Sequence, residues 1–308
     1  MRILIELPTW LGDAVMATPA IENLAEFFHG SEIILIGSVV SIDALKNHPK
    51  VSKTYVLERE YINIYRAIKF FGKLDIFFSF RSSLRSKFIK FLISSPRKYQ
   101  FDKNKFLNGH QVEKYNNFIN NVLNIALIPE KLTLQSQKSI RKSKNKVLGI
   151  NPGAAYGSAK RWYPEKFAAV AHDLSSKYDV VILGGDKEKD IASDIEKYLI
   201  EKGVTNFQNL AGQTSLDELI IQIANLDLFI TGDTGPMHLA AAYQIPTIAI
   251  FGPTNYLETS QWMNEKSVIV KKDLECQPCM KRVCPLKHHK CMKLIEASDV
   301  LKEVKGLN

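Results

Sequence analysis

Short apolar runs, each ended by a glycine-containing or polar turn and followed by a helical pattern, recur along this 308-residue chain. The first half contains RILIEL, EIILIG, TYVL and DIFFSF, and the second half contains VLGINPG, DVVILGG, DLFITGD and PTIAIFGP. Strands that alternate with helices form parallel sheets covered by helices on both faces. We therefore predict an α/β protein made of two successive doubly wound halves.

A polar segment separates the two halves. QSQKSIRKSKNK (135–146) is basic and lacks apolar periodicity, so we predict that it is a linker between domains at 1–140 and 146–290. Ligands of such sheets bind beyond the carboxyl ends of the strands, so we expect a cleft where the two sets of strand ends face each other. The predicted helices cover residues 14–28, 61–72, 82–93, 164–178, 188–203, 216–226 and 235–243.

The composition is that of an ordinary globular protein, with 45% hydrophobic and 24% charged residues. The apolar runs are too short to cross a membrane. Glu6 and Asp13 interrupt the apolar core that a signal peptide would need. We therefore expect a cytoplasmic location.

The charge is unevenly distributed. Residues 1–150 carry 23 Lys and Arg against 12 Asp and Glu, whereas residues 151–308 carry 18 against 20. The basic excess of the first half indicates an anionic partner, such as a nucleic acid, a membrane surface, or a phosphorylated or carboxylated substrate. A lysine-rich solvated surface would explain the same excess equally well.

One turn of the second half suits a phosphate group. FITGDTGPMH places Asp233 and Thr234 between a predicted strand and a predicted helix, with Met237 and His238 in the first helical turn. The N–H groups and the positive dipole end of a helix N-terminus attract anions. When this turn is taken alone, ordinary helix capping by Asp233 or Thr234 is the favoured explanation.

A second turn of the same half offers cations. NPGAAYGSAKRW contains Ser158 and ends in Lys160 and Arg161, and its glycines let the backbone approach a ligand closely. A surface turn packed on Trp162 is the alternative. Because both turns follow strands of one sheet, we favour a nucleotide-diphosphate site in the C-terminal half.

Carboxylates follow two further strands. Asp13, after Gly12 in PTWLGDAV, is either a helix cap or a general base for a hydroxyl nucleophile. In GGDKEKD, either Glu188 or Asp186 could bond a ribose hydroxyl, although both also suit the first turn of a helix.

Four cysteines, Cys276, Cys279, Cys284 and Cys291, cluster with the spacing C-x2-C-x4-C-x6-C around His288 and His289. This spacing fits a structural zinc site, and it also fits a compact loop of buried thiols. The sequence leaves both interpretations open. The cluster does not look like the disulfide framework of a secreted protein.

The motifs LPTWLGDAVMATPAI, NPGAAYGSAKRWYPEKF, TGDTGPMHLAAA, IFGPT and CPLKHHKCM together resemble the heptosyltransferases of glycosyltransferase family nine over nearly the whole chain. The resemblance implies a GT-B fold, in which two Rossmann-like domains face each other across a cleft. It also implies that the C-terminal segment 291–308 forms a helix that packs back on the N-terminal domain.

The resemblance further implies an inverting transfer of L-glycero-D-manno-heptose from ADP-heptose to the first heptose of the lipopolysaccharide inner core, at the cytoplasmic face of the inner membrane. A type I or type III enzyme with a different core acceptor is the alternative. Asp13 matches the base and Lys160 matches the cation that neutralises the donor phosphates, with no catalytic metal. The expected donor-binding residues are Gly12, Ser158, Lys160, Glu188, Asp233, Thr234, Gly235, Met237 and His238.

The basic first half then has a candidate role in acceptor binding. Arg81, Arg85 and Lys87 follow the strand DIFFSF and could hold the anionic acceptor, although a solvated helix face explains them as well. A non-catalytic nucleotide- or nucleic-acid-binding protein is the alternative from another class. We expect no nucleic-acid partner, because the basic residues lack a stacking platform or a nucleic-acid motif.

Overall fold

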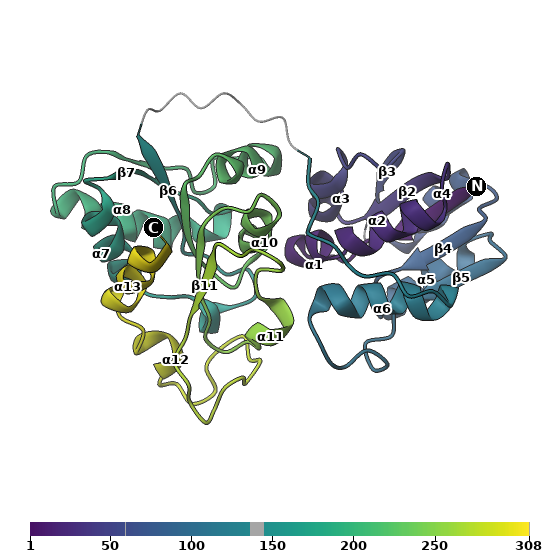
Figure 1. Ribbon diagram of the computed structural model, residues 1–308. Helices are drawn as coiled ribbons and strands as arrows, with labels where there is room; N and C mark the ends of the chain where they lie inside the picture. Colours follow the sequence, from purple (N-terminus) through teal and green to yellow (C-terminus); the bar gives the residue numbers. More distant parts are fainter. Residues whose placement is uncertain (59, 136–144, 308) are drawn as a thin grey trace. The chain divides into compact units, whose positions relative to one another are not determined.

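The computed structural model describes residues 1–58, 60–135 and 145–307, and the chain divides into two compact units, Met1–Gln135 and Ser136–Asn308 (Figure 1). The division between these units falls within the linker predicted at residues 135–146. Most of the expected linker, residues 136–144, lies outside the described residues.

The first unit contains a five-stranded parallel sheet with the order β3-β2-β1-β4-β5. Its central strand, β1, pairs Ile3 with Ile33 of β2 on one side and with Ile76 of β4 on the other. Ile3, Leu4 and Ile5 of β1, which point alternately to the two faces of the sheet, are all fully buried, and this explains the continuous apolar runs in the sequence. The strands are β1 Arg2–Glu6, β2 Glu32–Gly37, β3 Lys53–Val56, β4 Ile76–Ser79 and β5 Arg97–Gln100.

The helices of this unit, among its described residues, are α1 Leu11–Met16, α2 Thr18–Phe27, α3 Val39–Leu45, α4 Tyr61–Phe71, α5 Leu84–Leu92 and α6 Gln111–Leu123. The single helix predicted at 14–28 is in fact two helices that meet at Ala17. Pro19 has no N–H to donate to the Val15 carbonyl, and the Thr18 hydroxyl donates to this oxygen instead, over 2.7 Å.

The second unit contains a six-stranded parallel sheet with the order β11-β10-β9-β6-β7-β8, the strand order of a Rossmann fold. Its strands are β6 Lys146–Asn151, β7 Tyr178–Ile182, β8 Phe207–Asn209, β9 Leu228–Gly232, β10 Thr247–Ile250 and β11 Ser267–Val270. Its helices are η1 Ser158–Lys160, α7 Pro164–Leu174, η2 Asp186–Glu188, α8 Lys189–Glu201, α9 Leu216–Ala224, α10 Gly235–Ala242, α11 Tyr256–Thr259, α12 Lys290–Lys293 and α13 Ala297–Leu307.

The prediction that the C-terminal segment packs on the N-terminal domain is wrong. Helix α13 lies beside α7 and contacts β10 and β11 (Figure 1). Val300 and Val304 of α13 are buried in the same apolar core as Ile150 of β6 and Ile248 of β10. The apolar face of this helix therefore completes the core of the second unit.

Candidate active site

Two neighbouring strand ends of the second unit bring Lys160 and Asp233 together. Strands β6 and β9 are paired, with Asn151 opposite Thr231, so the loops that follow them start side by side. The Lys160 Nζ atom donates to Asp233 Oδ2 over 2.6 Å and to the Asp233 carbonyl over 3.1 Å. The structure thus confirms that the two turns singled out in the sequence meet at one edge of the sheet.

A third strand end supports this pair. Thr254 follows β10, and its hydroxyl donates to the same Asp233 Oδ2 over 2.6 Å. Asp233 and Thr254 are both buried. The Asp233 carboxylate therefore accepts one bond from a cation and one from a hydroxyl, which compensates for its removal from water.

Thr234 is the residue that precedes helix α10. Its hydroxyl accepts from Asn151 Nδ2 over 3.3 Å and lies 3.1 Å from the Thr231 hydroxyl. Asn151 at the end of β6 thus fixes the turn after β9. Helix α10 begins at Gly235, and the helix dipole is positive at this end. Pro236 has no N–H, and Met237 N donates to the Thr234 carbonyl over 3.2 Å, so the first backbone donor of the helix that suits a ligand is Gly235 N. This arrangement suits a phosphate beside Lys160.

Two predicted donor-binding side chains are inside the protein. Met237 is fully buried and packs against Ala249 and Phe251, and His238 is 3% exposed. A donor contact by Met237 would have to use its backbone. Ser158, by contrast, is exposed at the start of η1.

The loop that carries Lys160 is supported by the cysteine-rich segment. Ala159 N donates to the Arg282 carbonyl over 3.0 Å, and the Tyr156 hydroxyl donates to the Met280 carbonyl over 2.7 Å. A Cβ at Gly157 would lie 2.3 Å from the Arg282 carbonyl oxygen, so only glycine allows this close approach. His289 lies 2.9 Å from the Ala159 carbonyl through Nε2.

Glu188, the candidate ribose acid, lies among three glycines. Its Oε2 accepts from Gly185 N over 2.9 Å, and a Cβ at Gly153 would lie 2.1 Å from its Cγ. The side chain therefore links the ends of β6 and β7. Asp186 is instead exposed and forms an ion pair with Lys189 at 2.8 Å, so Glu188 is the better placed of the two for a ligand at the sheet edge.

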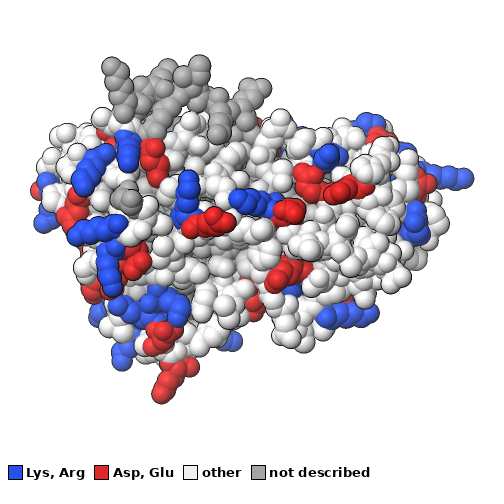
Figure 2. All heavy atoms as spheres, viewed as in Figure 1, with Lys and Arg blue, Asp and Glu red and all other residues white. Residues whose placement is uncertain are grey.

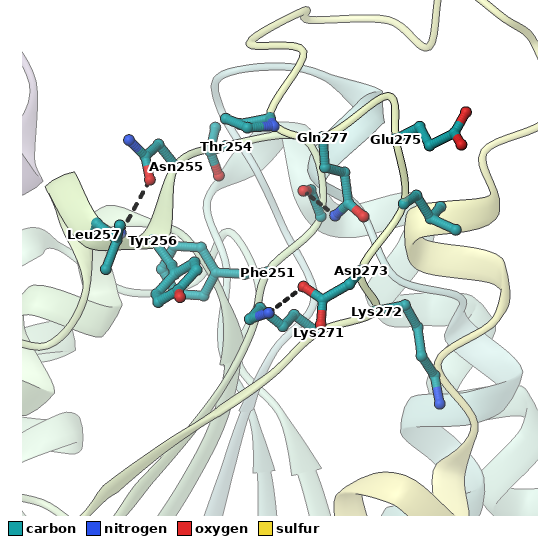
Figure 3. A pocket seen from close by; sticks show the side chains of 13 residues that line it. Phe251, Thr254, Asn255, Tyr256, Leu257, Lys271, Lys272, Asp273, Glu275 and Gln277 are labelled. Atoms are coloured by element: carbon teal, nitrogen blue, oxygen red, sulfur yellow. Dashed lines mark hydrogen bonds and ion pairs between the residues drawn. The ribbon is translucent and has the colours of Figure 1, made fainter.

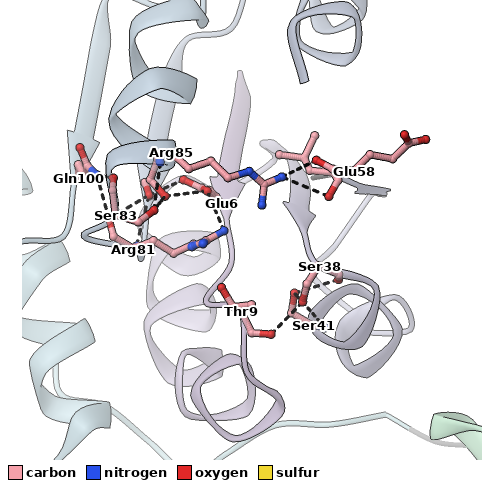
Figure 4. Close-up of polar contacts among 12 residues, drawn as sticks. Glu6, Thr9, Ser38, Ser41, Glu58, Arg81, Ser83, Arg85 and Gln100 are labelled. Atoms are coloured by element: carbon pink, nitrogen blue, oxygen red, sulfur yellow. Dashed lines mark hydrogen bonds and ion pairs between the residues drawn. The ribbon is translucent and has the colours of Figure 1, made fainter. Parts of the chain in front are cut away.

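A buried carboxylate that the sequence analysis did not select, Glu6, ends β1 in the first unit (Figure 4). Glu6 accepts from the hydroxyls of Ser79 over 2.6 Å and Ser86 over 2.9 Å, and lies 3.4 Å from Arg81 Nη1. Burial raises the pKa of Glu6, and these hydrogen bonds and the Arg81 charge oppose that shift. A charged residue within the apolar run RILIEL was the available signal.

Asp13 and Arg81 both influence the pKa of one buried phenol. Burial raises the pKa of Tyr115 on α6 well above its usual value, the Asp13 carboxylate raises it further, and Arg81 acts in the opposite direction. Both charges are therefore close enough to influence Tyr115. Asp13 is half-buried in α1, directly after the buried Gly12. The candidate base and one candidate acceptor cation thus share one region of the first unit.

The other two acceptor candidates have different surroundings. The Arg85 Nη2 atom donates to the carbonyls of Leu57 and Glu58, over 3.3 and 2.6 Å, and its guanidinium points toward the segment after β3 (Figure 4). Lys87 is exposed on α5. Figure 2 shows acidic side chains among the basic ones on the visible face of this unit. The basic excess is thus not a continuous patch on that face.

The four cysteines share one small cavity. Cys276, Cys279, Cys284 and Cys291 are free thiols that line a space of about 20 Å³ together with His288 and His289. Burial and the neighbouring cysteines raise the pKa of Cys291 to about 11. Within residues 1–58, 60–135 and 145–307, no three Cys, His, Asp or Glu side chains are arranged to hold a metal ion. The zinc interpretation stays a prediction.

No helix among the described residues is both long and apolar enough to cross a membrane.

Comparison with known proteins identifies the family. The model of glycosyltransferase family 9 (heptosyltransferase) matches residues 78–290. The lipooligosaccharide heptosyltransferase 2 of Campylobacter jejuni serotype O:2 is 43% identical over 317 residues, which cover 100% of this chain and 98% of that protein. A second lipooligosaccharide heptosyltransferase 2, from C. jejuni serotype O:6, is 42% identical over the whole chain.

Solved structures share the fold. The structure of Escherichia coli ADP-heptose LPS heptosyltransferase II superimposes with a TM-score of 0.83 at 22% identity and covers 100% of this chain and 98% of that one. A family 9 glycosyl transferase from Veillonella parvula gives 0.82 at 20% identity, with 99% and 96% covered. The predicted GT-B fold of two Rossmann-like domains is confirmed. This chain belongs to glycosyltransferase family 9, the heptosyltransferases.

Proposed function

We propose that this protein transfers L-glycero-D-manno-heptose from ADP-heptose to the first heptose of the lipopolysaccharide or lipooligosaccharide inner core, with inversion at the anomeric carbon. The observation that carries the proposal is the meeting of Lys160, Asp233 and the N-terminus of α10 at one sheet edge. The relatives named heptosyltransferase 2, which align with the whole chain, support the choice of donor and acceptor.

In this mechanism, the second unit stabilises the leaving group. When the bond between the anomeric carbon and the β-phosphate oxygen breaks, negative charge grows on the departing ADP. The Lys160 ammonium and the positive dipole end of α10, with the Gly235 N–H, suit this charge. Because the same cation pairs with Asp233 at 2.6 Å, the diphosphate has to compete with that carboxylate for Lys160.

In this mechanism, the first unit binds the acceptor and activates its hydroxyl as the nucleophile. Asp13 acts as general base and takes the proton of the acceptor hydroxyl as its oxygen attacks the anomeric carbon. Arg81, held near Glu6, is suited to an anionic group of the acceptor, such as a phosphate or a carboxylate. Arg85 and Lys87 bind further anionic groups of the acceptor in this proposal. The proposed reaction uses no catalytic cofactor.

The location follows from the substrate. We place the protein in the cytoplasm, in peripheral contact with the inner membrane, where the lipid-anchored acceptor is found. The basic excess of residues 1–150 supports attraction to an anionic surface. Sedimentation with vesicles containing anionic lipid, compared with neutral vesicles, tests this contact, and equal recovery with both would exclude it.

The reaction is tested with purified protein, ADP-heptose and an acceptor that carries a single core heptose. We expect ADP release that depends on the acceptor, and a product whose new linkage has the anomeric configuration opposite to that of the donor. UDP-glucose serves as the control donor and should give no product. ADP release that is independent of acceptor, or a product with retained configuration, would contradict the proposal.

A further inference from the structure

A cavity of about 450 Å³ lies beyond the carboxyl ends of β10 and β11 in the second unit (Figure 3). Its wall is formed by residues 251–257, which follow β10, and residues 271–278, which follow β11. This volume is within the range of small-molecule sites. Thr254 belongs to the wall and also bonds Asp233, so the cavity adjoins the candidate phosphate site.

The charges of the cavity do not favour a phosphate. Its wall contains two cations, Lys271 and Lys272, and two anions, Asp273 and Glu275. Lys271 is paired with Asp273 (Figure 3), and Lys272 Nζ lies 2.8 Å from Asp299 Oδ2. Lys160 is paired with a carboxylate as well, but there the N-terminus of α10 adds its positive dipole end, whereas the helix that begins at this cavity, α11, has only four residues. The balanced charges here suit an uncharged ligand.

The remaining wall combines an aromatic ring with amides. The Tyr256 side chain lies near Phe251 and presents its ring within 5.1 Å of Lys271 Nζ (Figure 3). Gln277 Nε2 donates to the Gly252 carbonyl over 2.6 Å, while its buried Oε1 has no hydrogen-bond partner among the described residues. A buried amide oxygen without a partner is costly and indicates a missing donor.

The order of the strands indicates which part of a sugar nucleotide would bind in this cavity. The candidate ribose acid Glu188 follows β7, Lys160 and Asp233 follow β6 and β9, and the cavity follows β10 and β11. The phosphate site therefore lies between the candidate nucleoside position and the cavity. A nucleoside on the β7 side leaves the β10 side for a sugar.

We propose that this cavity is a subsite for an uncharged pyranose ring, with Tyr256 packed on the C–H face of the sugar and Asn255, Asp273 and Gln277 bonded to its hydroxyls. Pyranose rings have an apolar face and a rim of donors and acceptors, which matches this wall. The ring belongs either to the donor or to the acceptor. This assignment rests on the proposed function.

Two variants of the cavity test the assignment. Tyr256→Leu removes the aromatic platform but keeps apolar bulk, and Gln277→Leu removes the unpartnered amide oxygen. Tyr198→Ala is the matched control, because Tyr198 is exposed on α8 and is not part of the wall. The dissociation constant of ADP is measured by calorimetry, and KM is measured for ADP-heptose and for the acceptor.

We expect both cavity variants to raise one KM about tenfold and to leave ADP affinity unchanged. A rise in the KM of ADP-heptose assigns the ring to the donor, and a rise in the KM of the acceptor assigns it to the acceptor. Weaker ADP binding would show that the cavity holds the nucleoside. If the dissociation constant of ADP and both KM values stayed unchanged, the cavity would hold no substrate group. Either result overturns the assignment.

The cavity can also be tested without turnover. If the wild-type protein transfers no heptose, the proposed function fails, but saturation-transfer NMR with methyl α-D-mannopyranoside still reports on the subsite. Saturation transfer to this pyranoside in the wild type and its loss in Tyr256→Leu would support the subsite. No transfer in the wild type would overturn it.

Discussion

The ammonium of Lys160 lies 2.6 Å from Oδ2 of Asp233, and the hydroxyl of Thr254 donates to the same oxygen over 2.6 Å. The candidate phosphate-binding cation is therefore neutralised by a buried carboxylate before any donor binds. When a diphosphate approaches, Lys160 can turn to it while Thr254 still satisfies Asp233. In the proposed mechanism, Asp233 holds Lys160 in place until the leaving group binds to it.

Replacing Lys160 tests this role. We expect Lys160→Met to weaken ADP binding at least tenfold and to reduce transfer about 100-fold or more, because the charge on the departing β-phosphate loses its cation. The variant should also lose about 1–3 kcal/mol of stability, since Asp233 stays buried without its charged partner. Calorimetry with ADP and thermal unfolding measure the two effects. Lys197→Met, an exposed lysine on α8, is the control.

Asp13 is predicted to act on the acceptor alone. Asp13→Asn should lower kcat about 10²–10⁴-fold, because the amide cannot take the hydroxyl proton. Its ADP affinity should match that of the wild type, because the candidate ADP site is in the other unit. Initial rates and ADP calorimetry on the same preparation provide the comparison. Retention of most of the activity would remove Asp13 from the mechanism.

Glu6 is predicted to position Arg81. In Glu6→Gln, the neutral amide no longer attracts the guanidinium, so the KM of the acceptor should rise three- to tenfold while the KM of ADP-heptose stays constant. Arg81→Ala should raise the acceptor KM at least as much. The control is Arg66→Ala, which removes an exposed arginine of α4 from the same unit. If Glu6→Gln lowered stability but changed neither KM, its role would be structural only.

His48 gives the protein a specific pH dependence. Its ring is 3% exposed, and burial lowers its pKa to about 4 although the Glu22 carboxylate lies 3.2 Å away. Between pH 6.5 and about 4, the unfolded chain binds a proton that the folded chain does not. Stability should therefore fall as the pH decreases through this interval, by up to about 3 kcal/mol.

Urea unfolding of the wild type and of His48→Gln at pH 7 and pH 5 measures this contribution. The variant should lose less stability than the wild type between the two values, because glutamine does not titrate. Equal losses in the two proteins would show that His48 does not contribute.

The thiols differ in their expected reactivity. Because the pKa of Cys291 is raised to about 11, this buried residue should react with iodoacetamide at pH 8 much more slowly than Cys276, Cys279 and Cys284. Peptide mass spectrometry after timed alkylation identifies the modified residues. Protection of all four, lost after treatment with a chelator, would instead support the metal interpretation of the C-x2-C-x4-C-x6-C spacing.

The sequence predicted those parts of the fold that short-range patterns determine. The buried strands β1, β2, β6 and β9 appear as apolar runs, and their polar ends mark the site because parallel strands end at one edge of the sheet. The edge strands β5, β8 and β11 were missed. RKYQ and FQN are short and largely polar, and the apolar SVIV of β11 has only four residues. Neither alternation nor a long apolar run identifies such segments.

The long-range contacts could not be predicted from local patterns. Helix α13 has an apolar stripe that signals a buried face, but the sequence does not show which sheet that face covers. Thr254 and Asn151 lie in the motifs IFGPT and NPGAAYGSAKRW, yet their hydrogen bonds to Asp233 and Thr234 depend on strand order. Glu6 was overlooked because a polar residue at the end of a strand usually marks only where the strand stops.

The most direct test is the mass of the product formed from ADP-heptose with three truncated core acceptors that carry no heptose, one heptose or two heptoses. We predict that the one-heptose acceptor alone gains the mass of a single heptosyl residue. Transfer to the heptose-free acceptor or to the two-heptose acceptor, or the absence of any product, would contradict the proposed reaction.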